Sequence, residues 1–172
     1  MLENTDINRA QGSVRTNTVP QYSKAPARRM DDILRGLTFE FLGQGAHKTS
    51  PEALLGDPNA TLLDVRTDEE VRAVRFPLEG LALQSLHIPL SDLPDRTEEI
   101  PSRGMVAILC VSDVRSAIAY VYLQSQGFRN VRILAGGTAQ LLSQLKTGNV
   151  RKQLLARRNY QMTGTNPGES KS

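Results

Sequence analysis

The single cysteine of this chain, Cys110, follows the apolar run 105–109 and precedes a short loop that leads to Arg115. Backbone amides at the start of the helix expected after this loop, together with the Arg115 guanidinium, favour an anion. The thiolate is the nucleophilic form of cysteine. We therefore predict that Cys110 is a catalytic nucleophile cradled by a loop made of Val111, Ser112, Asp113, Val114, Arg115 and Ser116.

Two interpretations of this region stay open. A lone cysteine after an apolar run is also typical of a small buried hydrophobic residue. Its place at the carboxyl end of a predicted parallel strand favours reactivity, because open α/β sheets place their sites at that edge.

The charged residues near the site also have two possible roles. Arg115 either positions an anionic donor or holds the loop through a carboxylate. Asp64 and Arg66 end another strand and either support the site or satisfy loop amides and each other.

Composition excludes several classes of protein. The chain has 172 residues with 39% hydrophobic content, enough for one domain with one modest core. One cysteine rules out an intramolecular disulfide, and the two histidines, His47 and His87, are far apart, so we predict no metal. No apolar stretch approaches a membrane span, and residues 1–30 lack a secretory signal. We expect a cytoplasmic protein that does not enter a membrane.

Charge is distributed unevenly. Residues 1–50 contribute +2, residues 51–145 contribute −4 and residues 146–172 contribute +5 to a formal net charge of +3. The basic tail fits an acidic protein partner, or it is simply a solvated helix face. We expect no nucleic-acid partner, because no aromatic stacking platform or DNA-binding motif accompanies the charge.

Strands and helices are predicted to alternate within residues 30–145. Residues 1–29 lack apolar periodicity and are predicted to be a flexible leader, and residues 146–172 a basic helical or disordered tail. Between them we predict an amphipathic helix over 30–42, strands over 61–66, 85–90, 105–109 and 131–134, and helices over 68 onward, 92–99, 116–126 and 138–145. Thr67 is predicted to cap the helix from residue 68, and Ser91 the helix that ends at Glu99. This order predicts an α/β fold with a central, mostly parallel sheet and helices on both faces.

Five short pieces, in this order, resemble the rhodanese-like domain, a family of sulfurtransferases. They are Leu62-Leu63-Asp64-Val65-Arg66 followed by acids, His87-Ile88-Pro89-Leu90, the loop from Cys110 to Ser116, Gly127-Phe128-Arg129-Asn130-Val131, and Leu134-Ala135-Gly136-Gly137. The pieces span roughly residues 46–145. Gly136 and Gly137 are expected to allow a tight turn close to the cysteine loop.

The resemblance implies sulfur transfer through a persulfide on Cys110. The thiolate would take the outer sulfur of a small donor, thiosulfate or a persulfide, and pass it to a thiol or protein acceptor in a ping-pong scheme. Loop amides would stabilise both the thiolate and the persulfide. No cofactor is required.

The spacing of the loop and its departures from the family leave two rival functions. Cys110 and Arg115 are separated by four residues, whereas phosphatases that resemble this fold have five, so phosphate hydrolysis is the less favoured reaction. Asp113 stands where many members have glycine, and a carboxylate inside the loop opposes thiolate formation and repels an anionic donor. A catalytically weak or inactive binding or regulatory module is therefore the main alternative.

Overall fold

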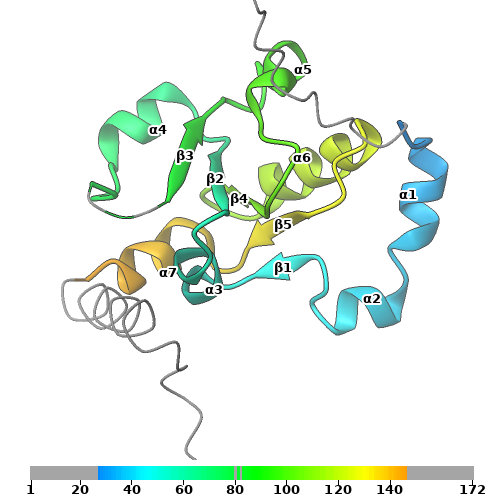
Figure 1. The fold of residues 1–172 in the computed structure, drawn as a ribbon, viewed down its shortest axis with the longest axis horizontal. Coiled ribbons are helices and arrows are strands. Elements are labelled where there is room, and N and C mark those ends of the chain that lie inside the picture. The colour runs from blue at the N-terminus through cyan, green and yellow to red at the C-terminus, as the bar shows by residue number, and fades with distance from the viewer. Residues whose placement is uncertain (1–26, 80, 82, 147–172) are drawn as a thin grey trace, which may run out of the picture.

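A computed structural model of the chain describes residues 27–146 except 80 and 82, so the predicted leader and basic tail lie almost wholly outside it. Its centre is a five-stranded parallel sheet in the order β1-β5-β4-β2-β3 (Figure 1). The strands are β1 (Lys48–Thr49), β2 (Thr61–Asp64), β3 (Gln84–His87), β4 (Val106–Leu109) and β5 (Val131–Leu134). This confirms the predicted α/β fold class.

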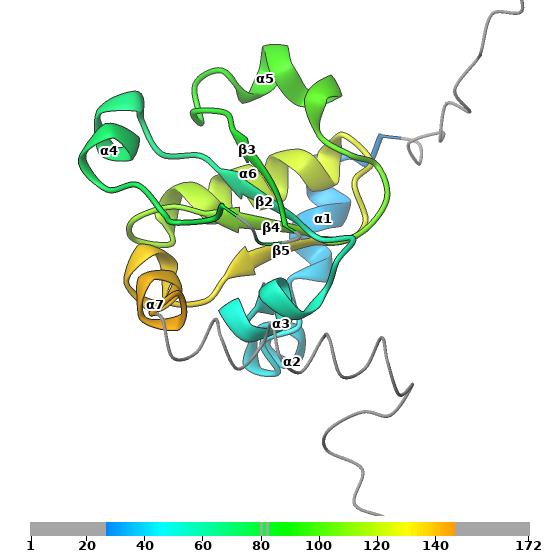
Figure 2. The ribbon, with the colours of Figure 1, turned by 60° about the vertical axis from the view of Figure 1, so that its left-hand side comes forward.

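Helices cover both faces of the sheet. They are α1 (Met30–Gly36), α2 (Phe39–Gly43), α3 (Pro51–Gly56), α4 (Asp68–Ala73), α5 (Leu93–Arg96) with a following 3₁₀ turn (Thr97–Glu99), α6 (Val114–Ser125) and α7 (Gly137–Gln144). Figure 2 shows α3 and α7 on one side of the sheet, and α6 with α1 on the other. No helix in the described part of the chain is long and apolar enough to cross a membrane.

The central strand β4 is apolar at every position because both of its faces are covered. Val106 and Ile108 pack in the core beneath α6, whereas Ala107 and Leu109 pack in the core beneath α3 and α7. All four are buried. A strand covered on both faces needs apolar residues on both, so the period-two alternation disappears.

Several predicted boundaries shift, and two short elements were missed. β2 ends at Asp64 rather than at residue 66, and α6 begins at Val114 rather than at residue 116. β1 has only two residues, too few to show any periodicity, and it exists because it pairs with β5. α3 had a usable signal: the Ser50 side chain caps it and Pro51 occupies its first position.

The single helix predicted over 30–42 is wrong. The segment forms two short helices, α1 and α2, with a break at Leu37 and Thr38. The Thr38 hydroxyl accepts a hydrogen bond from the Phe41 amide at 3.2 Å, so Thr38 caps a new helix instead of continuing the first. The break turns part of the apolar stripe outward, and Ile33 is the only buried residue of the two helices.

The first residue of α7 packs tightly against the loop that follows β4. Gly137 has φ of +52°, and a Cβ there would lie 2.7 Å from the Cys110 carbonyl oxygen and 3.1 Å from that of Val111. Only glycine fits such a close approach in this conformation. The expected tight turn beside the cysteine loop is therefore present.

Gly137→Ala is predicted to lower the free energy of unfolding by about 2 kcal/mol or more, because the new Cβ meets backbone at positive φ. Urea denaturation measures the loss. Gly56→Ala, at the end of α3, is the matched control because its Cβ would meet nothing within 4 Å. The control is expected to be neutral or slightly stabilising. Equal effects of the two variants would contradict the tight packing of α7 on the loop.

Candidate active site

Cys110 lies directly after β4, at the carboxyl end of a strand flanked by β5 and β2. Cys110 is only 1% exposed and belongs to the hydrophobic core beneath α6. The loop from Val111 to Asp113 joins it to α6, so Arg115 and Ser116 lie in the first turn of that helix. The buried Ser116 hydroxyl donates to the Ile108 carbonyl at 3.3 Å and ties this turn to β4.

The cysteine loop exposes a set of unused backbone donors. Asp113 adopts a left-handed conformation with φ of +57°, and its carbonyl accepts from the Ala117 amide at 2.8 Å. Five amides of this loop and of the first turn of α6 donate no hydrogen bond to any described residue; they belong to Val111, Ser112, Asp113, Arg115 and Ser116. Such donors at the start of a twelve-residue helix form an anion-binding concavity.

The direction of two of these amides follows from the packing of α7. The carbonyls of Cys110 and Val111 approach Gly137, and the chain has no cis peptide in its described part. In a trans peptide the N–H points opposite to the preceding carbonyl. The amides of Val111 and Ser112 therefore point away from α7, toward the opposite side of the cysteine loop.

Arg115 is held by a carboxylate. Its Nη1 donates to Glu70 Oε2 at 2.6 Å and its Nη2 donates to Glu70 Oε1 at 2.7 Å. These hydrogen bonds are the main reason that the pKa of Arg115 is raised, with smaller contributions from the charges of Cys110 and Asp64. Of the two roles considered for Arg115, the geometry matches the one that holds the loop.

Glu70 is placed by the start of α4. The Thr67 hydroxyl accepts from the Glu70 amide, while the Glu70 carboxylate accepts from the Thr67 amide at 2.9 Å, a complete capping box. The Arg115 hydrogen bonds, followed by that of Thr67, hold the pKa of Glu70 at about 2. Sequence reasoning predicted Thr67 as the cap but overlooked Glu70. The Thr-x-x-Glu spacing was the available signal.

Asp64 and Arg66 form a buried ion pair behind the loop. Arg66 Nη2 donates to Asp64 Oδ2 at 2.6 Å. Arg66 is 1% exposed and Asp64 is 5% exposed. Arg66 Nη1 donates to the Val74 carbonyl at 3.0 Å and to that of Glu70 at 3.4 Å. The Phe76 ring lies 4.6 Å from the guanidinium carbon. Arg66 therefore ties α4 to the end of β2 at Glu70, within the helix, and at its C-cap Val74.

Three exposed apolar side chains lie in the cysteine loop and in the first two turns of α6. Val111, Val114 and Ile118 are 48%, 64% and 54% exposed, and we call these three residues the apolar rim. Val114 and Ile118 are one turn apart on α6 and face the same way. Because the Arg115 guanidinium is paired with the Glu70 carboxylate, the loop presents apolar surface and the partly exposed Asp113 rather than an unpaired cation.

The contacts of both histidines are with residues outside the cysteine loop. His87 Nε2 lies 2.8 Å from the Arg66 carbonyl oxygen. His47 stacks near Phe41 and Tyr120, with ring centroids 6.0 and 6.5 Å away. Its buried Nδ1 has no partner within the described residues. Burial is the larger cause that lowers the pKa of His47, and the charge of Lys48 lowers it further.

The Glu70–Arg115 pair predicts a specific acid sensitivity. Because the folded pKa of Glu70 is about 2, below its ordinary 4.5, the ionised pair stabilises the fold fully above about pH 4.5 and progressively less as the pH falls toward 2. Glu70→Gln is expected to cost about 1 to 2 kcal/mol near neutral pH, allowing for partial solvent screening, and almost nothing near pH 2.

Urea denaturation of wild type and variant between pH 2 and pH 7 measures this difference. Glu69→Gln is the matched control, since Glu69 pairs with Arg72 in an exposed i,i+3 bridge and should change stability far less. A Glu70→Gln effect that stays constant across the range would contradict a depressed pKa.

Comparison with known proteins agrees with this geometry. A family model described as rhodanese-like domain matches residues 49–144, from the end of β1 to the end of α7. YtwF of Bacillus subtilis, which carries a provisional sulfurtransferase name, is 34% identical over 85 residues, 49% of this chain and 77% of its own. A sulfurtransferase of Allochromatium vinosum is 34% identical over 86 residues, 50% of this chain and 75% of its own.

Among solved structures, a rhodanese-like domain protein from Staphylococcus aureus is 26% identical and aligns with a TM-score of 0.46, covering 55% of this chain and 89% of its own. The matched residues of the family model contain Cys110, its loop, Glu70 and the Asp64–Arg66 pair. The helices α1 and α2 precede the match. This chain belongs to the rhodanese-like domain family.

Proposed function

We propose that this protein is a sulfurtransferase that carries a sulfane sulfur on Cys110. The observation that supports this most directly is the set of five unused amides in the loop between Cys110 and the first turn of α6. Such preoriented dipoles stabilise a sulfur anion without reorganisation. The sulfurtransferase names of two relatives at 34% identity support the same reaction class.

The proposed reaction has two balanced steps. The Cys110 thiolate attacks the outer sulfur of a persulfide donor, a new S–S bond forms at Sγ, the donor's own S–S bond breaks, and the donor leaves as a thiolate. An acceptor thiolate then takes the outer sulfur and regenerates the Cys110 thiolate. No net oxidation occurs, and a reducing compartment such as the cytoplasm suits a free thiol.

The residues around Cys110 divide the remaining work. The amides of Val111 to Ser116 hold the charge of the thiolate and of the persulfide. Arg115, paired with Glu70, fixes the first turn of α6 and adds positive charge near the sulfur. Asp64 and Arg66 act at one remove, because they position α4 and Glu70.

The apolar rim favours one class of donor. Thiosulfate is a compact dianion, and Asp113 repels it while no unpaired cation of the loop attracts it. A persulfide carried on a larger organic or protein thiol gains instead from contact with Val111, Val114 and Ile118. We infer that a persulfide is the better donor.

A non-catalytic binding module is the second candidate, and one observation favours it. Cys110 is 1% exposed in this structure, so sulfur transfer requires the side chains around it to part. A module that only binds a partner would leave Cys110 unmodified. Mass spectrometry after exposure to a sulfur donor separates the two functions.

Incubation with glutathione persulfide is predicted to add one sulfur atom to wild-type protein, at Cys110, and a thiol acceptor should remove it. Cys110→Ala should neither gain the sulfur nor turn over, because no other cysteine is present. Its circular dichroism spectrum and its melting transition serve as the folding control. A folded variant that still transfers sulfur, or a wild type that never gains it from glutathione persulfide, thiosulfate or a protein persulfide, would overturn the proposal.

Asp113→Asn is predicted to raise kcat/KM with thiosulfate about fivefold, equivalent to roughly 1 kcal/mol for removing one nearby repulsive charge. The rate with glutathione persulfide should change less. Asparagine tolerates the left-handed backbone, so the loop keeps its shape. Asp95→Asn, exposed on α5, controls for net charge. An unchanged thiosulfate rate in Asp113→Asn would show that this carboxylate does not govern donor choice.

A further inference from the structure

A cavity lies along α6, and no residue of the cysteine loop lines it. Its volume is about 310 Å³, and α1, α2, the second half of α6 and the turn before β5 line it. Tyr120 and Gln124 contribute from α6, while Cys110 and its loop lie before the first turns of that helix. Five of the eight lining residues come from residues 28–41, which precede the family match.

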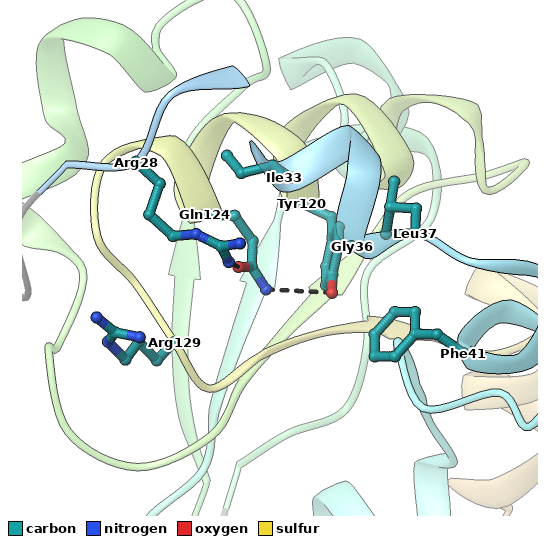
Figure 3. Close-up of a pocket in the computed structure, with 8 residues that line it drawn as sticks. All are labelled: Arg28, Ile33, Gly36, Leu37, Phe41, Tyr120, Gln124 and Arg129. Carbon is teal, nitrogen blue, oxygen red and sulfur yellow. Dashed lines mark hydrogen bonds between the residues drawn. The ribbon is translucent and has the colours of Figure 1, made fainter. Parts of the chain in front are cut away.

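The cavity has a polar end and an apolar end. Figure 3 shows Arg28, Gln124 and Arg129 at one end and Leu37 with Phe41 at the other, with Tyr120 between them. Small-molecule sites commonly combine an apolar wall with a few polar groups that fix orientation. The volume suits a ligand about the size of one or two aromatic rings.

The two guanidinium groups at the polar end have no carboxylate partner within the described residues. Arg28 donates only to neutral oxygens, Gln124 Oε1 at 3.1 Å and the Asp32 carbonyl at 3.4 Å. Arg129 makes no hydrogen bond or ion pair in the described part of the chain. The acids of α1 lie instead beside Arg29 and Arg35. Among the residues that the structure describes, the polar end therefore carries positive charge that no carboxylate pairs with.

A buried hydroxyl faces the same space. Gln124 Nε2 donates to the Tyr120 hydroxyl oxygen at 3.1 Å, so Gln124 is held at both ends of its amide. Tyr120 is 4% exposed, and its own O–H has no acceptor within the described residues. Burial raises the pKa of Tyr120, so the hydroxyl stays protonated and able to donate. A buried donor without an acceptor is costly unless a ligand or water completes it.

We propose that this cavity binds a small organic anion, a carboxylate attached to an aromatic or branched apolar group, with its charge between Arg28 and Arg129, one oxygen on the Tyr120 hydroxyl and its apolar body against Leu37 and Phe41. The site is independent of sulfur transfer. Bidentate contact with planar guanidinium groups accounts for the preference for a carboxylate.

The test uses the full-length protein and 2-naphthoate as probe, followed by ¹H–¹⁵N NMR and calorimetry. Saturable shifts are expected at Tyr120, Gln124 and Arg129, with no comparable shifts in the cysteine loop. The neutral analogue 2-naphthalenemethanol should bind at least tenfold more weakly, and inorganic phosphate, which lacks an apolar body, should also bind at least tenfold more weakly.

Variants separate charge from shape. Arg129→Gln should weaken 2-naphthoate binding about tenfold and Arg129→Lys should restore part of it, while Arg75→Gln removes an exposed charge elsewhere and should have no effect. Gly36→Leu should block the cavity, since a Cβ there points toward the Arg28 guanidinium at 4.0 Å. Binding of the neutral analogue as tight as that of naphthoate, equal effects of Arg129→Gln and Arg75→Gln, or shifts confined to the cysteine loop would overturn the proposal.

Discussion

The ion pair between Glu70 and Arg115 is the interaction on which the geometry of the cysteine loop depends. It joins the first turn of α4 to the first turn of α6 with two short hydrogen bonds. Each turn follows a neighbouring strand of the sheet, so the pair closes the space above the carboxyl ends of β2 and β4. Behind it, the buried Arg66 holds the carbonyls at Glu70 and Val74. Asp64 and Arg66 are buried, whereas Glu70 and Arg115 are partly exposed, so removing Asp64 or Arg66 leaves a buried charge unpaired and costs more stability than removing Glu70 or Arg115.

The same pair explains why a positive residue next to the cysteine need not attract a free anion. Glu70 neutralises Arg115, and the five free amides are then the main donors left in the loop. Dipoles of this kind stabilise a single sulfur charge, whereas they offer little to a compact dianion approaching past Asp113. The apolar rim works in the same direction, because it is desolvated more readily by an organic donor than by a strongly hydrated one. Charge and surface therefore both support the proposed persulfide donor.

Sequence patterns predicted the parts of this structure that depend on local chemistry. The buried strands, the Thr67 cap, the glycine turn beside the loop and the place of Cys110 at a strand end all have short-range signals. The ion-pair partner of Arg115 has no such signal, because Glu70 and Arg115 come together only when β2 and β4 pair. The break at Thr38 has a signal that competes with the apolar stripe around it, and the cap prevailed. Burial of Cys110 depends on every neighbouring element at once.

Helix α6 connects the two candidate sites of the molecule. Its first turn carries Arg115 beside the cysteine loop, and its second half carries Tyr120 and Gln124 in the cavity under α1. The segment that completes the cavity lies before the family match, and of the residues in α1 and α2 it buries only Ile33. Arg28 anchors that segment to the end of α6 through its own amide, which donates to Ser125, and through Gln124. An anion that bridges Arg28 and Arg129 would strengthen this attachment, because it would link the segment to the turn before β5 as well as to the helix.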